Sequence, residues 1–173
     1  PGGLSRYVLN LAKGLTLKNH KVWVASSGGE WLTKLKTGST VSHRLIPIKT
    51  KSICSPKIFF SFLPLRKLVI NEDIKIIHCN TRVTQFLGFL VSRSLKVAYL
   101  SAFHGFYRST WMRRTFKFSG QATIAVSKAV KNHLVTDLEI DPEKVSVVYN
   151  GVDLNQFEGK QYRSSRQASC NDY

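Results

Sequence analysis

Acidic residues are scarce in this sequence. Its 173 residues include 26 lysines and arginines but only 10 aspartates and glutamates, which gives a formal net charge of +16. Such a charge favours a polyanion, a membrane surface or phosphorylated ligands as partners. The basic residues are spread along the chain and form no dense run, so a nucleic-acid-binding tail is not indicated. A merely solvated basic surface explains the same pattern equally well.

Long hydrophobic runs and cysteines are also rare. No apolar run approaches the roughly 20 residues that cross a membrane, and the best candidate, IFFSFLPL, is interrupted by Ser61 and Pro64. The three cysteines, Cys54, Cys79 and Cys170, lack metal-ligand spacing and favour reduced thiols in the cytoplasm. With 43% hydrophobic and 21% charged residues, the composition is that of a globular protein.

Apolar strands and amphipathic helices alternate along the chain. In the opening PGGLSRYVLNLAKGL, apolar residues recur at helical spacing, so two glycines stand at the first turn of a helix. A proline at the first turn favours a helix over 56–69, although Pro64 should kink or divide it. The alternation predicts an α/β fold with a doubly wound parallel sheet. The predicted strands are VWVAS, HRLIPI, IKIIHCN, KVAYLSAFHG, TIAVS and KVSVVYNG, and the further predicted helices are VTQFLGFLVSRSL, SKAVKNHLVTDL and a short one at WMRRTFKF.

Polar or glycine-containing clusters follow four of the predicted strands. They are HCNTR, FHGFY, VSK and YNGVD. Because ligands of a parallel sheet bind outside the carboxyl ends of its strands, these clusters mark one candidate site. Ordinary turns explain each cluster taken alone, and Ser127 is by residue type a helix N-cap.

The ordered set of these motifs resembles glycosyltransferase family 4, whose members are retaining, sugar-nucleotide-dependent enzymes of the GT-B fold. The resemblance runs from GGLSRYVLNLA through KNHKVWV, DIKIIHCN, FHG and AVSKAVKNHL to EKVSVVYNGVD and Phe157. It implies that residues 1–158 are a Rossmann-like, acceptor-side N-terminal domain and that 159–173 are a polar tail or linker. It also implies that the usual first strand and the donor-binding second domain are missing, so that the chain is a fragment with little activity alone.

The resemblance further implies transfer of a hexose from a nucleotide-sugar to a lipid-linked or polysaccharide acceptor, in the synthesis of cell-surface glycans such as lipopolysaccharide. The nucleotide-sugar is a co-substrate, and no cofactor or metal is expected. The fingerprint GxGxxG is absent, so NAD binding is not inferred. His104 is the predicted catalytic residue, placed beside the donor sugar, although a histidine that only satisfies backbone groups at the strand end remains an alternative. The remaining predicted contacts are donor-binding Gly2, Gly3, Asn150 and Gly151, and acceptor-binding Ser5, Arg6, Tyr7, Asn80, Arg82, Tyr107 and Arg108.

Two other interpretations stay open. The first is a non-catalytic basic α/β module that binds anionic membrane or nucleic acid, although no sequence-specific nucleic-acid motif is present. The second is a sugar-nucleotide sensor of the same fold without catalysis. The segment KTKSICSPKIFFSFLPLRK combines basic and aromatic residues. It predicts either a core helix with solvated lysines or a surface that rests on anionic lipid at the inner face of the membrane.

Overall fold

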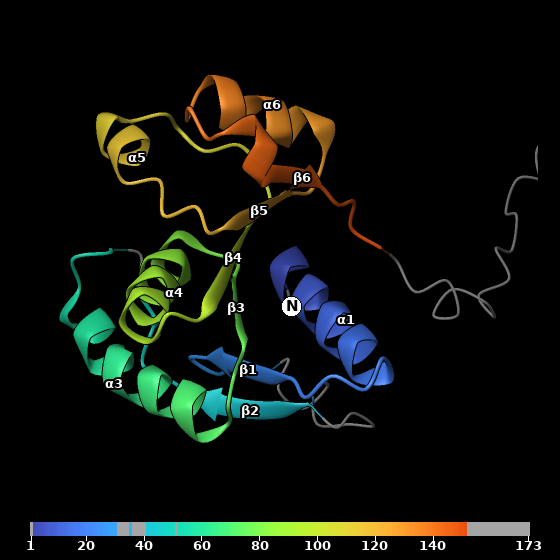
Figure 1. The fold of residues 1–173 in the computed structure, drawn as a ribbon, viewed down its shortest axis with the longest axis vertical. Helices are drawn as coiled ribbons and strands as arrows, with labels where there is room; N and C mark the ends of the chain where they lie inside the picture. Colours follow the sequence, from blue (N-terminus) through green and yellow to red (C-terminus); the bar gives the residue numbers. More distant parts are fainter. Residues whose placement is uncertain (1, 31–34, 36–40, 51, 152–173) are drawn as a thin grey trace, which may run out of the picture.

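Helices and strands alternate in the computed structural model, which describes residues 2–30, 35, 41–50 and 52–151 (Figure 1). The predicted α/β alternation is confirmed over these residues. The last motif residues Val152, Asp153 and Phe157, Cys170, and the predicted tail 159–173 lie outside them. The elements are α1 (Gly3–Leu17), β1 (Trp23–Ser26), β2 (Ser42–Leu45), α3 (Pro56–Asn71), β3 (Ile76–Cys79), α4 (Arg82–Leu95), β4 (Ala98–Phe103), α5 (Trp111–Thr115), β5 (Ala122–Ala125), α6 (Lys128–Thr136), a 3-10 turn (Pro142–Lys144) and β6 (Val145–Val147).

All the described strand pairs are parallel, as predicted, but the strands form two sheets. β1 pairs with β2, with Trp23 opposite Ser42, and the second sheet has the order β3-β4-β5-β6. In the second sheet Ile76 lies opposite Ala98. Within the described chain, β1 and β3 each have a strand on one side only, so each leaves one edge of backbone groups unpaired.

Helices cover both sides of the larger sheet. α3 and α4 lie on one side of β3 and β4, and α1 lies on the other (Figure 1). The core beneath α3 and α4 includes Ile58, Leu87 and Val91. Helix α4 approaches this sheet closely at Gly88, where an added Cβ would lie 2.4 Å from the Cys79 sulfur. Coverage of both faces is what a parallel sheet requires, because its strands are apolar on both sides.

Side-chain caps fix where helices α4 and α6 begin. Ser127 accepts a hydrogen bond from the Val130 backbone N–H at 3.1 Å, so its predicted capping role is confirmed. Thr81 and Thr84 form a capping box at the start of α4. Pro64 does not divide α3, which runs on through it. A proline removes only one backbone hydrogen bond, and burial of one face of α3 offsets that loss.

Candidate functional site

Two polar side chains meet at the carboxyl ends of the neighbouring strands β3 and β4. His104 directly follows β4, and its Nε2 lies 3.0 Å from Oδ1 of Asn80, which directly follows β3. A carboxamide oxygen can only accept, so the His104 Nε2–H donates, and a neutral ring then keeps Nδ1 as an acceptor. Asn80 therefore fixes the orientation of the His104 ring.

Tyr7, from the second turn of α1, lies against this pair. The rings of Tyr7 and His104 meet edge to face with centroids 4.5 Å apart, and the Tyr7 and His78 centroids are 6.3 Å apart. Burial raises the pKa of the Tyr7 hydroxyl above its ordinary value. The contact holds the start of α1 beside the strand ends. We call Tyr7, His78, Asn80 and His104 the histidine cluster.

Both histidines of the cluster favour the neutral form. Burial, with a smaller contribution from the charge of His104, lowers the pKa of His78 to about 4. Burial also lowers the pKa of His104. The His78 Nε2 is buried and has no hydrogen-bond partner among the described residues. At neutral pH the cluster is therefore uncharged and presents imidazole nitrogens as hydrogen-bonding groups.

The loop after β4 is held in place from α6. The Tyr107 backbone N–H donates to Nε2 of His133 at 3.0 Å, and the His133 Nδ1–H donates to Asp137 at 2.6 Å. The Tyr107 hydroxyl in turn accepts a 3.4 Å hydrogen bond from the His104 backbone N–H. These contacts link α6 through Tyr107 to the histidine cluster.

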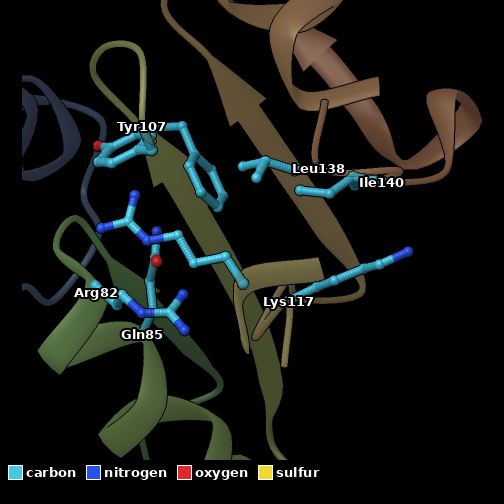
Figure 2. Close-up of a pocket in the computed structure, with 8 residues that line it drawn as sticks. Arg82, Gln85, Tyr107, Lys117, Leu138 and Ile140 are labelled. Atoms are coloured by element: carbon cyan, nitrogen blue, oxygen red, sulfur yellow. The ribbon is translucent and has the colours of Figure 1, made fainter. Parts of the chain in front are cut away.

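A small pocket adjoins Tyr107, and we call it the arginine pocket. Figure 2 shows Arg82 and Gln85 on one side of it, Tyr107 at its edge, and Leu138 and Ile140 on the other side. Its lining consists of Arg82, Gln85, Phe103, Tyr107, Arg113, Lys117, Leu138 and Ile140.

Aromatic rings orient the two guanidinium groups of the pocket. Arg82 lies over the Phe118 ring and Arg113 over the Tyr107 ring, each with its guanidinium carbon 5.4 Å from the ring centroid. Burial, and secondarily the charge of Arg113, lowers the pKa of Arg82. The Gln85 side chain, which also lines the pocket, donates to the Ala102 carbonyl at 3.2 Å and so ties α4 to β4.

The structure brings together some of the residues predicted from the sequence. His104 and Asn80 are hydrogen-bonded, Tyr7 touches His104, and Tyr107 connects this cluster to Arg82 in the pocket. The exposed Gly2 and Gly3 lie at the start of α1, where an added Cβ would meet no atom within 4 Å. That end of α1 leaves room for a ligand to approach the backbone.

Other predicted residues stand apart from both groups. Within the described chain, no side-chain hydrogen bond, ion pair or ring contact joins them to the histidine cluster, and they do not line the arginine pocket. These five residues are Arg6, Arg108, Asn150 and Gly151, which are exposed, and Ser5, which is half-buried.

Arg113 and His78 were not predicted as site residues. Arg113 lies in a short helix within the long connection between β4 and β5, and the sequence gives no signal for where that connection folds back. His78 precedes Asn80 by two positions, and strand alternation alone places both side chains on the same face of the sheet.

The described part of the chain holds neither a cluster of metal ligands nor a membrane-spanning helix. Over residues 2–30, 35, 41–50 and 52–151, no three His, Cys, Asp or Glu side chains gather in a way that could hold a metal ion. Among those same residues, no helix is long and apolar enough to span a membrane.

Comparison with known proteins gives a consistent result. The chain is 24% identical to a crystal structure of a glycosyltransferase from Rickettsia africae, with a TM-score of 0.80, covering 91% of this chain and 42% of that one. The Anabaena protein Alr3699/HepE, solved in complex with UDP-glucose, is 16% identical with a TM-score of 0.70, covering 90% of this chain and 42% of that one. These likenesses establish the fold as the Rossmann-like N-terminal half of a GT-B glycosyltransferase.

A curated relative adds a likeness in sequence. The Escherichia coli enzyme named UDP-Gal:alpha-D-GlcNAc-diphosphoundecaprenol alpha-1,3-galactosyltransferase is 29% identical over 124 residues, which are 65% of this chain and 32% of that enzyme. The chain thus spans less than half the length of each of these proteins. Residues 1–156 match Glycosyltransferase Family 4. This match covers most of the chain, and we conclude that the protein belongs to glycosyltransferase family 4.

Proposed function

We propose that this chain forms the acceptor-side half of a retaining glycosyltransferase, which moves a hexose from a nucleotide-sugar to a lipid-linked or polysaccharide acceptor. The observation that carries the proposal is the histidine cluster at the carboxyl ends of β3 and β4, with the open start of α1 beside it. UDP-glucose in the Anabaena neighbour and the diphosphate-linked lipid in the name of the Escherichia coli relative support these substrate classes.

The chemistry assigns roles to the start of α1 and to the His104–Asn80 pair. The departing nucleotide diphosphate is anionic, and the backbone N–H groups of Gly2 and Gly3, which stand where a helix leaves its first N–H groups without intrahelical partners, suit such a group. His104, held by Asn80, presents Nδ1 to a hydroxyl of the donor sugar, which donates a hydrogen bond to it. A neutral, oriented ring binds the sugar without reorganising as charge develops in the transition state.

A chimera tests this proposal. Residues 1–156 are joined to the remaining part of the Rickettsia africae glycosyltransferase, and UDP release and sugar transfer are measured with UDP-glucose, UDP-galactose and UDP-N-acetylglucosamine. Isoprenyl diphosphate-linked sugars and soluble glycans serve as acceptors. We expect acceptor-dependent transfer with retained anomeric configuration, and no transfer by the 173-residue chain alone. A folded chimera without donor-dependent transfer, or a product of inverted configuration, would contradict the proposal.

We also propose that the protein works at the cytoplasmic face of an anionic membrane. Helix α3 buries Ile58 on its inner face, whereas Phe59, Phe60 and Leu63 are 71%, 66% and 53% exposed on its outer face. Lys57 stands in the first turn of the same helix, and its ammonium donates a hydrogen bond to the backbone carbonyl of Lys49. An apolar row flanked by lysines matches the acyl boundary and the phosphates of an anionic bilayer.

Vesicle sedimentation tests the membrane proposal. We expect binding that requires anionic lipid, weakens with salt and falls when Lys49, Lys51 and Lys57 become Gln. A matched variant replaces Lys21, Lys75 and Lys144, which pair with acidic residues elsewhere, and removes the same charge. Absence of binding at low salt, or equal loss in both triple variants, would contradict the proposal.

A further inference from the structure

The arginine pocket holds two cations that have no acidic partner in the described part of the chain. Within the described chain, neither Arg82 nor Arg113 forms an ion pair, although both are half-buried and line the same pocket. Two guanidinium groups that share a partly desolvated pocket repel one another, and each loses hydration. An anion between them would relieve both costs.

The neighbouring cations differ in this respect. Arg114 lies 3.7 Å from Glu139 and donates to the Ser109 hydroxyl and the Asp137 carbonyl. The Lys117 ammonium donates to the Glu139 carbonyl, and Figure 2 shows it pointing away from Arg82. Lys117 therefore contributes its aliphatic stem to the pocket. The unpaired positive charge belongs to Arg82 and Arg113.

The geometry suits a phosphate group in particular. A guanidinium donates two parallel hydrogen bonds to a phosphate, and the Phe118 and Tyr107 rings, 5.4 Å from the guanidinium carbons of Arg82 and Arg113, take up none of these donors in a hydrogen bond that the described chain shows. The wall opposite Arg82 is apolar, because it is made of Leu138 and Ile140 (Figure 2). A phosphate attached to a hydrocarbon chain meets both surfaces at once.

We infer that Arg82 and Arg113 bind a phosphate group of the acceptor, the one that joins its sugar to a lipid chain. The inference rests on the proposed function and makes it more specific. Tyr107 connects the pocket to the cluster, because its ring lies under Arg113 while its hydroxyl meets the His104 backbone. A phosphate held there lies next to the site of transfer. The donor's diphosphate has the same chemistry, so the test separates the two sources.

Isothermal titration of the 173-residue chain is the test, with three probes: geranyl diphosphate, UDP and inorganic pyrophosphate. Geraniol serves as the uncharged comparison. We expect geranyl diphosphate to bind more tightly than pyrophosphate and geraniol not to bind. The double variant Arg82→Gln/Arg113→Gln should lose about tenfold or more in affinity for geranyl diphosphate, because charge-assisted hydrogen bonds to phosphate are lost. Arg114→Gln, which removes a cation already paired, should bind as the unmodified chain does.

A second variant separates the effect of positive charge from that of the paired guanidinium donors. Arg82→Lys/Arg113→Lys keeps both charges but loses the forked donors, so its affinity should fall between those of the original and the Gln variant. Thermal melts check that each variant is folded. If the Gln variant loses affinity for UDP but keeps its affinity for geranyl diphosphate, the assignment to the acceptor is overturned. The phosphate site would then belong to the donor.

Equal affinities of the chain and the Gln variant for every probe, or no binding to the unmodified chain, would overturn the inference entirely. Failure of the proposed function has a different readout, because it is the absence of sugar transfer by the chimera. If the chimera transfers sugar but the Gln variant binds every probe as the unmodified chain does, only the inference about the arginine pocket is rejected.

Discussion

The stability of this fold should fall in mild acid because His78 is buried in its neutral form. The unfolded chain protonates this histidine with an ordinary pKa of about 6.5. The folded chain protonates it only near pH 4, because burial, together with the charge of His104, disfavours the imidazolium. Between these two values the unfolded state binds more protons, so lowering the pH favours unfolding.

The size of the effect follows from the two pKa values. Proton linkage gives a loss of about 2 kcal/mol in unfolding free energy between about pH 7.5 and about pH 5, and about 3 kcal/mol once the pH is below 4. The stability is fully present above the unfolded pKa and is lost as the pH falls toward the folded one. His78→Leu removes the titrating group and a buried nitrogen that has no partner in the described chain.

Urea denaturation at the two pH values provides the assay. The difference in unfolding free energy between them should shrink by about 2 kcal/mol in His78→Leu. His20, exposed in the turn after α1, provides the control, and His20→Gln should keep the full difference. An unchanged pH dependence in His78→Leu would refute the reasoning, and so would an equal change in both variants.

Three further changes test other parts of the structure. Gly88→Ala should cost about 1–3 kcal/mol of unfolding free energy in urea, because the new Cβ would lie 2.4 Å from the Cys79 sulfur, and unchanged stability would contradict the close packing. Gly3→Val should leave the melting temperature nearly unchanged, because the added side chain meets open space. The same change should weaken UDP-glucose binding in the chimera, and unaltered affinity would remove Gly3 from the donor site. Fusing an apolar strand of about six residues before residue 1 should raise the melting temperature by pairing the edges of β1 and β3. A cooperative, high-temperature melt that the added strand leaves unchanged would contradict that argument.

The elements of this fold were largely predictable because each has a strong local signal. The strand IIHC and the helix that follows it differ clearly in periodicity, and Ser127 caps α6 as its residue type indicates. The division into two sheets was not predictable, since strand pairing depends on contacts far apart in the sequence. Pro64 does not divide α3, because burial of one face of the helix offsets the local penalty of a proline.

The candidate site was predictable only where sheet topology brings residues together. His104 and Asn80 follow adjacent parallel strands, so the strand order alone places them side by side. Arg113 comes from the β4–β5 connection, whose path depends on Tyr107 being held by His133. That contact joins residues 26 positions apart, and no periodicity in the sequence encodes it.

Sugar transfer by the chimera, with and without His104, tests the central claim most directly. We expect His104→Ala to lower turnover by about 100-fold or more, with an unchanged fold, because the oriented ring would act at the reacting sugar. His20→Gln serves as the control and should keep full turnover. Loss of transfer in His104→Ala alone is the predicted result, and unaltered transfer in a folded His104→Ala chimera would contradict the account.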